Sequence, residues 1–400
     1  MQKLSFETLL FDDRNDHIEG TFLNVFSFSI PKEVLSKIGE FIVEKNTISF
    51  ETENAREKFN AILDEALLQL TNNVTKKKTV YVHRNAGIPL LGNIAFGLID
   101  RGTNIIEVRP ISGCNIRCVY CSVNEDQREV DFVVDADYLA DEFKKLVAFK
   151  GIKGIEAHIA SQGEPTMYAD LPRLVQRIKE IPEVTTISID TNGILLTKSR
   201  IDDLVKAGLT RVNFSINAID AQVAKKIADV GDGYNIQKVL DTAKYLSDKV
   251  ELIIAPVYVS GWNDAELEKI IEFTKSLKNT RFEPKCYIQN FLNYRFGRNP
   301  AKSLDFEKFF EKLKELEKKH GIKLIINAAD FGIVKTKSLP KPFKEGDVVR
   351  AKTVSVGRLP NEVLAVANDR VISLFNPRKE GMVNVKITQD KHNLFYGVVV

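Results

Sequence analysis

The feature that most constrains the fold is a regular alternation of short apolar strands and amphipathic helices, which begins near Asn104. Six strands are predicted, at 104–112, 154–161, 184–192, 211–217, 250–260 and 280–290. Helical stretches lie between them, such as DADYLADEFKKLVAFK before the second strand and IQKVLDTAKYLSDK before the fifth. Repeated strand-then-helix units favour a parallel sheet with helices packed outside it. The alternation therefore predicts an α/β fold for the middle of the chain.

The same strands indicate what the sheet encloses. In the fourth strand (RVNFSIN), Asn213, Ser215 and Asn217 share one face and the apolar residues share the other. In the third strand (TISID), Asp190 lies on the polar face. A solid barrel would be filled with branched apolar side chains, so polar inner faces predict an open, partly hydrated cavity that holds a ligand. The alternative is a solvent-facing sheet, and the helices on the outer face argue against it.

Three of the four cysteines lie within eight residues, in the loop after the first predicted strand. Cys114, Cys118 and Cys121 have the spacing C-x3-C-x2-C, at a strand end where α/β barrels place their chemistry. A [4Fe–4S] cluster bound by three thiolates leaves its fourth iron open to a substrate or cofactor. A structural zinc site needs a fourth ligand, and the nearest candidates, His158 and Cys286, are far away in sequence. Three reduced core cysteines are the remaining alternative, against which the polar residues of the loop argue.

The cysteine spacing, with Tyr120 directly before the last cysteine, resembles the cluster loop of the radical S-adenosylmethionine (radical SAM) superfamily. SQGEPT, at the end of the second strand, is similar to that family's glycine-glycine-glutamate motif, with Gln162 in place of the first glycine and Gly163 and Glu164 retained. DTNG follows the third strand as the family's TNG turn does. NFSIN resembles the fourth-strand segment, and VYVSGWND resembles the fifth-strand element that ends in a glycine. Five elements thus follow the family's order across 104–327.

The resemblance implies a partial (β/α)6 barrel of the TIM type and an Fe–S oxidoreductase of archaeal type. It implies that the three cysteines bind a [4Fe–4S] cluster whose open iron is chelated by the amino and carboxylate groups of SAM. One electron, from a reductant such as ferredoxin or flavodoxin, then cleaves the sulfonium and gives a 5′-deoxyadenosyl radical that abstracts hydrogen from a substrate. The residues implied to contact SAM are Tyr120, Gln162, Gly163, Glu164, Asp190, Asn192, Ser215, Asn217, Val257 and Gly261.

Individual roles follow from the same resemblance, and several have a structural alternative. Glu164 would hold the methionyl ammonium group, or would only cap the helix that follows it. Tyr120 would contact the adenine. Ser215 and Asn217 would bind the ribose or the carboxylate, although Ser215 can instead pair with a neighbour inside the barrel.

Four further residues also have two interpretations. Strand alternation in RFEPKCYIQN directs Cys286 toward the helices, which predicts a buried thiol rather than a cluster ligand. His158 would lie inside the barrel as an acid–base group, a substrate contact or a structural histidine. Arg109 and Arg117 flank the cysteine loop, where they offset thiolate charge or are simply surface-exposed.

We expect four segments. An N-terminal α+β extension spans 1–103, and amphipathic patterns such as 48–73 predict that it is largely helical. The partial barrel spans 104–330, a linker rich in proline, lysine and glycine spans 331–344, and a small β-barrel spans 345–400.

The C-terminal segment resembles the small TRAM or OB-type barrels that several tRNA-modifying enzymes carry. Residues 341–400 include ten basic and six acidic residues, and such barrels bind strands through basic grooves and exposed aromatic rings. The candidate RNA-binding cations are Arg350, Lys352, Arg358, Arg370, Arg378 and Lys379, together with Lys76, Lys77 and Lys78 if these lie nearby. The alternative is a solvated surface on an accessory domain.

We therefore expect a radical SAM enzyme that modifies RNA, with tRNA as the first candidate, by methylation or another carbon-centred change. Sulfur insertion is disfavoured because the first hundred residues contain no cysteine to hold a second cluster. The alternatives are a radical enzyme that acts on a protein side chain, lipid or small metabolite, and a metal-stabilised RNA-binding protein without catalysis. A net charge of +3 and the lack of a long apolar run predict a soluble cytoplasmic protein.

Overall fold

The centre of the molecule is a seven-stranded sheet with the strand order β17-β15-β14-β13-β12-β10-β9. The computed structural model describes residues 1–160, 162–277, 282–283, 285–377 and 381–400. Six strands run parallel, and β9 joins the edge antiparallel to β10. Their bounds are β9 Gly97–Asp100, β10 Ile105–Arg109, β12 Ile155–Ile159, β13 Val184–Thr191, β14 Arg211–Phe214, β15 Glu251–Ile254 and β17 Lys285–Cys286. The predicted α/β fold with a partial (β/α)6 barrel is confirmed.

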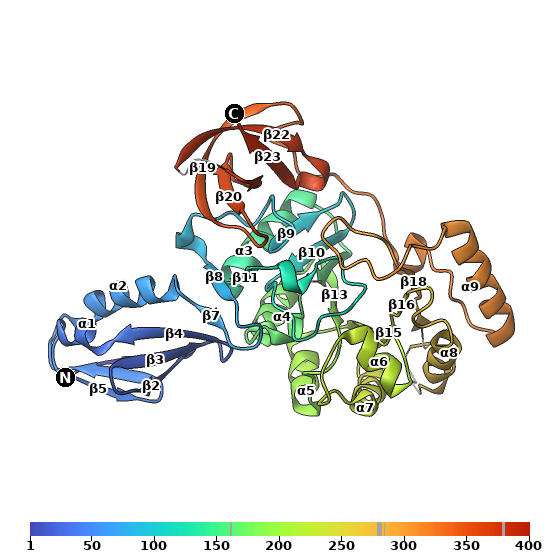
Figure 1. Cartoon of the computed structure of the whole chain (residues 1–400), viewed down its shortest axis with the longest axis horizontal. Coiled ribbons are helices and arrows are strands. Elements are labelled where there is room, and N and C mark those ends of the chain that lie inside the picture. Colours follow the sequence, from blue (N-terminus) through green and yellow to red (C-terminus); the bar gives the residue numbers. More distant parts are fainter. Residues whose placement is uncertain (161, 278–281, 284, 378–380) are drawn as a thin grey trace.

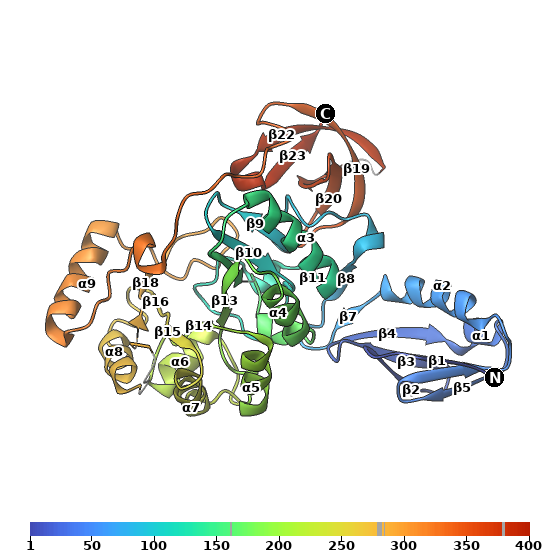
Figure 2. The ribbon, with the colours of Figure 1, turned by 180° about the vertical axis from the view of Figure 1, so that it is seen from behind.

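Helices cover the outer face of this sheet (Figures 1 and 2). The predicted helices are α3 Ala136–Lys150, α4 Leu171–Lys179, α5 Lys198–Ala207, α7 Ile236–Ser247 and α8 Glu266–Ser276. The N-cap Asp135 accepts a hydrogen bond from the Tyr138 N–H at 2.8 Å and begins α3, and Gly151, in the left-handed conformation, ends it. Two further helices, α6 Ala221–Ala228 and α9 Phe306–His320, were not predicted. No helix in the described part of the chain has the length and apolarity that crossing a bilayer requires.

The sixth predicted strand, 280–290, is interrupted. Residues 278–281 and 284 lie outside the described residues, and the rest forms β17 and the short β18 Gln289–Asn290. Strand β18 pairs in parallel with β16 Val257–Tyr258 and forms a separate two-stranded sheet with it.

The N-terminal region consists mainly of strands, so the prediction of a helical extension needs correction. Its strands are β1 Gln2–Ser5, β2 Leu9–Asp13, β3 His17–Phe22, β4 Phe26–Pro31, β5 Phe41–Glu44, β6 Thr47–Phe50, β7 Thr71–Asn72 and β8 Lys78–Val82. The α-helices there are α1 Lys32–Ser36 and α2 Ala55–Leu67, and α2 lies within the stretch 48–73 that was predicted to be helical. Burial alternates along β3 with a period of two, which is the strand signal that the helical interpretation overlooked.

The N-terminal strands are joined to the core by β11 Val130–Val134, a strand that was not predicted. It pairs in parallel with β8 and completes a six-stranded sheet of order β11-β8-β7-β4-β3-β2. This sheet therefore contains strands from both sides of residue 103. In both views the N-terminal strands project away from the core on one side, and α9 lies on the other (Figures 1 and 2).

The C-terminal residues form a closed five-stranded barrel of order β19-β20-β21-β23-β22, which confirms the predicted small β-barrel. The strands are β19 Val348–Val356, β20 Glu362–Ala367, β21 Arg370–Phe375, β22 Met382–Gln389 and β23 Phe395–Val399. The barrel has an apolar core of its own around Phe343 and Phe395. It sits on the core beside β9 and α3 (Figures 1 and 2).

Candidate cofactor site

The loop that follows β10 carries the three clustered cysteines and is held by backbone hydrogen bonds from two sides. The Val119 N–H donates to the Ile227 carbonyl in α6 at 2.9 Å. The Asn124 N–H donates to the Phe296 carbonyl at 2.7 Å. Helix α6 and the segment that contains Phe296, both missed by sequence reasoning, thus position the cysteine loop.

One cavity lies at the carboxyl ends of the core strands, beneath this loop. It is lined by all the predicted cysteines and cofactor residues except Asn217 and Gly261. Asn213 and Gln289 also line it, although neither was named as a site residue. Most of the predicted site residues thus lie together at one cavity, because the ends of parallel strands meet at one edge of a sheet.

The donor groups of the cavity fit a [4Fe–4S] cluster. Cys114, Cys118 and Cys121 are free thiols, each only partly exposed. Burial raises the pKa of all three, with Cys118 reaching about 12 and Cys114 well above its usual value. Thiolates in such a place need nearby positive charge, which a bound metal centre supplies. Three soft donors on one short loop match the preference of iron–sulfur clusters.

Glu164 is buried, and both of its carboxylate oxygens already accept hydrogen bonds. Oε1 accepts from the Thr166 N–H at 2.9 Å and from the Thr191 hydroxyl at 2.7 Å. Oε2 accepts from the Asn192 N–H at 2.8 Å. The predicted capping role is therefore present, because Glu164 is the N-cap of the short helix Pro165–Met167. Burial raises the pKa of Glu164, although these hydrogen bonds oppose the shift.

Gly163 is required by a close approach of two backbones. A Cβ atom at this position would come within 2.6 Å of the Ser112 carbonyl group. The next N–H, from Glu164, donates to the Gly113 carbonyl at 2.8 Å. The loop after β12 thus lies directly against the start of the cysteine loop.

Gln162, the residue that departs from the family's motif, contacts the C-terminal barrel. Its Oε1 accepts a hydrogen bond from Nη1 of Arg358, in the turn between β19 and β20. Its Nε2 lies 3.5 Å from the hydroxyl of Ser122, next to Cys121. The preceding Ser161 lies outside the described residues. Arg358 was predicted as an RNA-binding cation, but it is 5% exposed.

Asn217 lies behind the cavity wall and connects two of its elements. Its Nδ2 donates to the Tyr120 hydroxyl at 2.7 Å, and its Oδ1 accepts from the Val257 N–H at 2.8 Å. Gly261 lies farther along, where its N–H donates to Asp264 at 2.6 Å and its φ is +80°. Of the two predicted contacts outside the cavity lining, Asn217 thus supports Tyr120 and Val257, and Gly261 contacts no lining residue in these hydrogen bonds.

The polar interior of the barrel is a connected network. His158 lies with Nδ1 2.8 Å from the Ser188 hydroxyl and Nε2 3.4 Å from the Asp190 carboxylate. Ser188 donates to Glu156 at 2.6 Å. Burial alone would lower the pKa of His158, but Asp190, and then Glu156, raise it to about 9. The predicted inward orientation of His158 is confirmed.

Three other predictions can be compared with the structure. Cys286 is fully buried in the apolar core, as strand alternation predicted. Arg117 is exposed and pairs with Asp126 at 3.1 Å. Arg109 is buried instead, and it donates to Glu107 at 2.6 Å.

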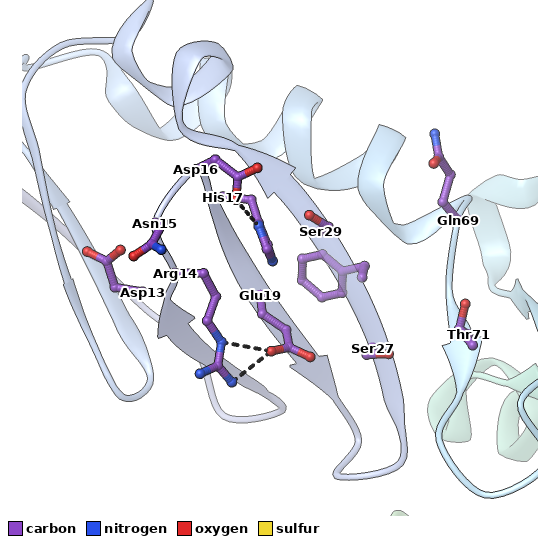
Figure 3. A pocket seen from close by; sticks show the side chains of 11 residues that line it. Asp13, Arg14, Asn15, Asp16, His17, Glu19, Ser27, Ser29, Gln69 and Thr71 are labelled. Atoms are coloured by element: carbon purple, nitrogen blue, oxygen red, sulfur yellow. Dashed lines mark hydrogen bonds and ion pairs between the residues drawn. The ribbon is translucent and has the colours of Figure 1, made fainter.

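A second hollow lies on the N-terminal strands and is lined mainly by charged and polar side chains (Figure 3). Arg14 pairs with Glu19 at 2.9 Å, and His17 lies 2.7 Å from Asp16. These charges are satisfied by their own neighbours within the same sheet.

Comparisons with known proteins identify the class. The family model described as the radical SAM superfamily matches residues 108–274. An uncharacterized protein of Methanocaldococcus jannaschii is 42% identical over 361 residues, 83% of each chain. The chain belongs to the radical SAM superfamily, whose cofactors are a [4Fe–4S] cluster and SAM.

Other known proteins are less similar to this chain. A GTP 3′,8-cyclase of Limosilactobacillus fermentum is 37% identical over 188 residues, which are 46% of this chain and 54% of the cyclase. This chain thus spans about half the length of that relative. The crystal structure of Streptococcus suis SuiB bound to precursor peptide SuiA is 14% identical with a TM-score of 0.44, covering 81% of this chain and 72% of SuiB.

Proposed function

We propose that this radical SAM enzyme modifies RNA, with tRNA as the first candidate, through a carbon-centred change such as methylation. The cavity residues carry the cofactor roles: the three cysteines bind the cluster, and Glu164, Asn192 and Ser215 bind SAM. When bound, the reduced cluster supplies the electron that cleaves SAM to a substrate-activating radical. Glu164 fits the SAM ammonium because it lines the cavity and its Oε2 accepts only one of the hydrogen bonds described above, which leaves this oxygen able to accept another.

The observation that carries the RNA proposal is a stack of aromatic rings between the C-terminal barrel and the cysteine loop. Phe296 stacks on Phe375 of β21 with ring centroids 6.0 Å apart, and Phe375 stacks on Tyr396 of β23 at 6.3 Å. The Arg295 guanidinium lies over the Phe296 ring at 5.1 Å. Aromatic rings and arginine planes are the surfaces on which unpaired bases stack. An unpaired nucleotide held here would lie near the cofactor cavity.

The basic residues of the barrel support this proposal only in part. Arg350 and Lys352 are exposed on β19, as RNA binding requires. Arg370 is buried, like Arg358, and donates to the Asp369 carbonyl at 2.9 Å. Arg378 and Lys379 lie outside the described residues. We therefore assign the phosphate contacts to exposed cations of β19 and the base contacts to the aromatic stack.

A groove on the outer side of the cysteine loop offers a route for the reductant. Cys114 and Ile116 line both this groove and the cofactor cavity. Lys77, from the basic stretch before β8, also lines the groove and donates to the Glu125 carbonyl. We infer that an electron-transfer protein, such as a ferredoxin or flavodoxin, docks on this side, because Cys114 lines both the groove and the cofactor cavity.

A second candidate substrate is a free nucleotide or another small polar metabolite. The observation in its favour is the set of polar groups on the cavity wall, to which Asp190, Asn213 and Gln289 contribute. Relatives with 29–37% identity are named GTP 3′,8-cyclases, although they match over about half their length. Such a substrate would contact these polar groups and would not need the aromatic stack.

One experiment separates these candidates. Anaerobically reconstituted enzyme is mixed with total tRNA or with GTP, and SAM cleavage is measured after reduction. We expect tRNA to stimulate cleavage, tRNA affinity to fall steeply between 50 and 200 mM salt, and Phe375→Ala with Tyr396→Ala to weaken tRNA binding about tenfold. Stimulation by GTP with no tRNA binding would instead identify the small substrate. Mass mapping of RNA from a deletion strain then locates the modified nucleotide.

A further inference from the structure

The C-terminal barrel is fastened to the core by backbone hydrogen bonds near the cofactor site. The Val371 N–H donates to the Leu91 carbonyl at 2.8 Å, and the Phe395 N–H donates to the Gly92 carbonyl at 3.0 Å. The Arg358 carbonyl accepts from the Glu129 N–H, shortly after the cysteine loop, at 2.9 Å. Bonds of this kind fix the barrel in one register against the core. The turn that carries Arg358 is therefore held at the edge of the cofactor site.

Arg358 differs from the two other buried arginines near the site in its partners. Arg128 contacts Glu125 and lies 3.0 Å from Asp131. Arg109 has Glu107 at 2.6 Å. Each of these cations is thus balanced by a carboxylate of its own neighbourhood.

The hydrogen-bond acceptor of Arg358 is the neutral amide oxygen of Gln162. The carboxylate in its own turn, Glu362, instead accepts from the Leu359 N–H at 3.0 Å. Burial lowers the pKa of Arg358 to about 10, although the nearby charge of Glu362 opposes the shift, and at this value Arg358 is still charged at neutral pH. A buried charge with a neutral partner is costly unless an opposite charge lies nearby. The charge of Glu362 offsets part of this cost. Arg358 also acts on the Cys121 thiol, whose pKa its charge lowers against the effect of burial, so a cluster bound by the three thiolates would add further negative charge beside the guanidinium.

We propose that Arg358 is a positioning residue of the cofactor site, supplied by the C-terminal barrel. Its guanidinium holds Gln162 beside the cysteine loop and places one buried positive charge next to the cluster. This arrangement accounts for glutamine at 162, because a glycine there would leave the buried guanidinium without its acceptor. A nearby cation favours the more negative, reduced cluster and attracts the SAM carboxylate. The inference concerns the cofactors alone and does not depend on RNA as the substrate.

The test compares Arg358→Gln with Arg350→Gln in the full reconstituted protein. Both substitutions remove one positive charge from the same barrel, but Arg350 is exposed. We expect R358Q to shift the reduction equilibrium about tenfold against the reduced cluster, which corresponds to about 59 mV for one electron. We also expect SAM to bind about fivefold to tenfold more weakly. R350Q should change neither quantity.

Two further variants separate charge from hydrogen bonding. Arg358→Lys keeps the charge and should restore most of the midpoint potential. Gln162→Met removes the acceptor from the core side and should weaken SAM binding while the barrel stays docked. Equal potentials and SAM affinities in R358Q and R350Q, with unchanged thermal unfolding, would overturn the proposal. If R358Q releases the barrel, as limited proteolysis would reveal, unchanged SAM affinity in Q162M would overturn it instead.

Discussion

The N-terminal strands and the C-terminal barrel are both attached to the core, but their arginines are satisfied in different ways. Arg14, in the N-terminal hollow, is half exposed and pairs with Glu19 of the neighbouring strand (Figure 3). Arg358, in the barrel, is 5% exposed and donates a hydrogen bond to Gln162 of the core. The first charge is balanced within its own sheet. The second is placed where it influences the cofactor site.

This difference shows that a region can be attached to the core without contributing residues to the cofactor site. The N-terminal sheet is joined to the core through β8 and β11, directly after the cysteine loop. Its hollow nevertheless lies on strands that project away from the core. The barrel is distant in sequence, yet its turn meets the loop that carries Gln162.

The largest effect is expected when a cysteine of the cofactor site is replaced, and it concerns the amount of iron that the protein binds. Cys118→Ser should lower the bound iron from about four atoms per chain to almost none, because two thiolates cannot hold the cluster. Cys286→Ser is the matched control, since Cys286 lies in the apolar core and should leave the iron content unchanged. Iron and sulfide analysis after anaerobic reconstitution measures both. A full complement of iron in C118S would refute the assignment of the cluster ligands.

The next effect is expected at His158 in the interior of the core. It concerns the free energy of unfolding. The folded pKa of His158 is about 9, above its ordinary value of 6.5. The stabilisation from protonated His158 is therefore fully present below pH 6.5 and is lost as the pH rises through 9. We expect wild type to exceed His158→Gln in unfolding free energy by roughly 2–3 kcal/mol at pH 6, and by much less at pH 10.

Urea unfolding of both proteins across this pH range measures the difference. Asp190→Asn removes the carboxylate that raises the pKa of His158 and should abolish most of the pH dependence. A difference between wild type and H158Q that stays constant with pH would show that folding does not raise the pKa of His158.

Sequence alone predicted the parts of this protein that depend on local periodicity. The six core strands follow from the alternation of strands and helices, and a period of two placed Cys286 in the core and His158 in the interior. The cysteine spacing and the strand-end motifs predicted most of the cavity lining.

The parts that sequence missed depend on contacts between distant segments. Gln162 and Arg358 are separated by 196 positions, and a single arginine in a turn carries no local signal of burial. The one available signal was Gln162, which stands where the family's motif has a glycine. A polar side chain at such a position needs a hydrogen-bond partner. Strand β11 was missed for a related reason, because it pairs with the N-terminal β8 rather than with the core sheet.

A pair of glycine substitutions compares the two regions directly. A Cβ at Gly92, where φ is +111°, would overlap the backbone of Val371 and strain the docking of the barrel. A Cβ at Gly20 would overlap the ring of Phe28 within the N-terminal sheet. We expect Gly92→Ala and Gly20→Ala each to cost about 1–3 kcal/mol of stability. Only Gly92→Ala should weaken SAM binding, by about threefold to tenfold.

Thermal unfolding and equilibrium SAM binding, measured on the same preparations, check this pair. Equal losses of SAM affinity would mean that both regions act on the site through general destabilisation. An unchanged affinity in both would mean that the barrel is docked without influencing the cofactor.

The smallest effect is expected at Arg14. Arg14→Gln removes the same charge as Arg358→Gln, but from a half-exposed pair with Glu19. Exposed ion pairs contribute about 0.2–1 kcal/mol, because water and salt screen them and the long side chains lose entropy. Stability should therefore change by less than about 1 kcal/mol, and this small change should diminish further in high salt. SAM affinity and the cluster potential should remain those of wild type, since the charge is balanced within its own sheet. A shifted potential in R14Q would show that the N-terminal strands influence the cofactor after all, and the contrast with Arg358 would fail.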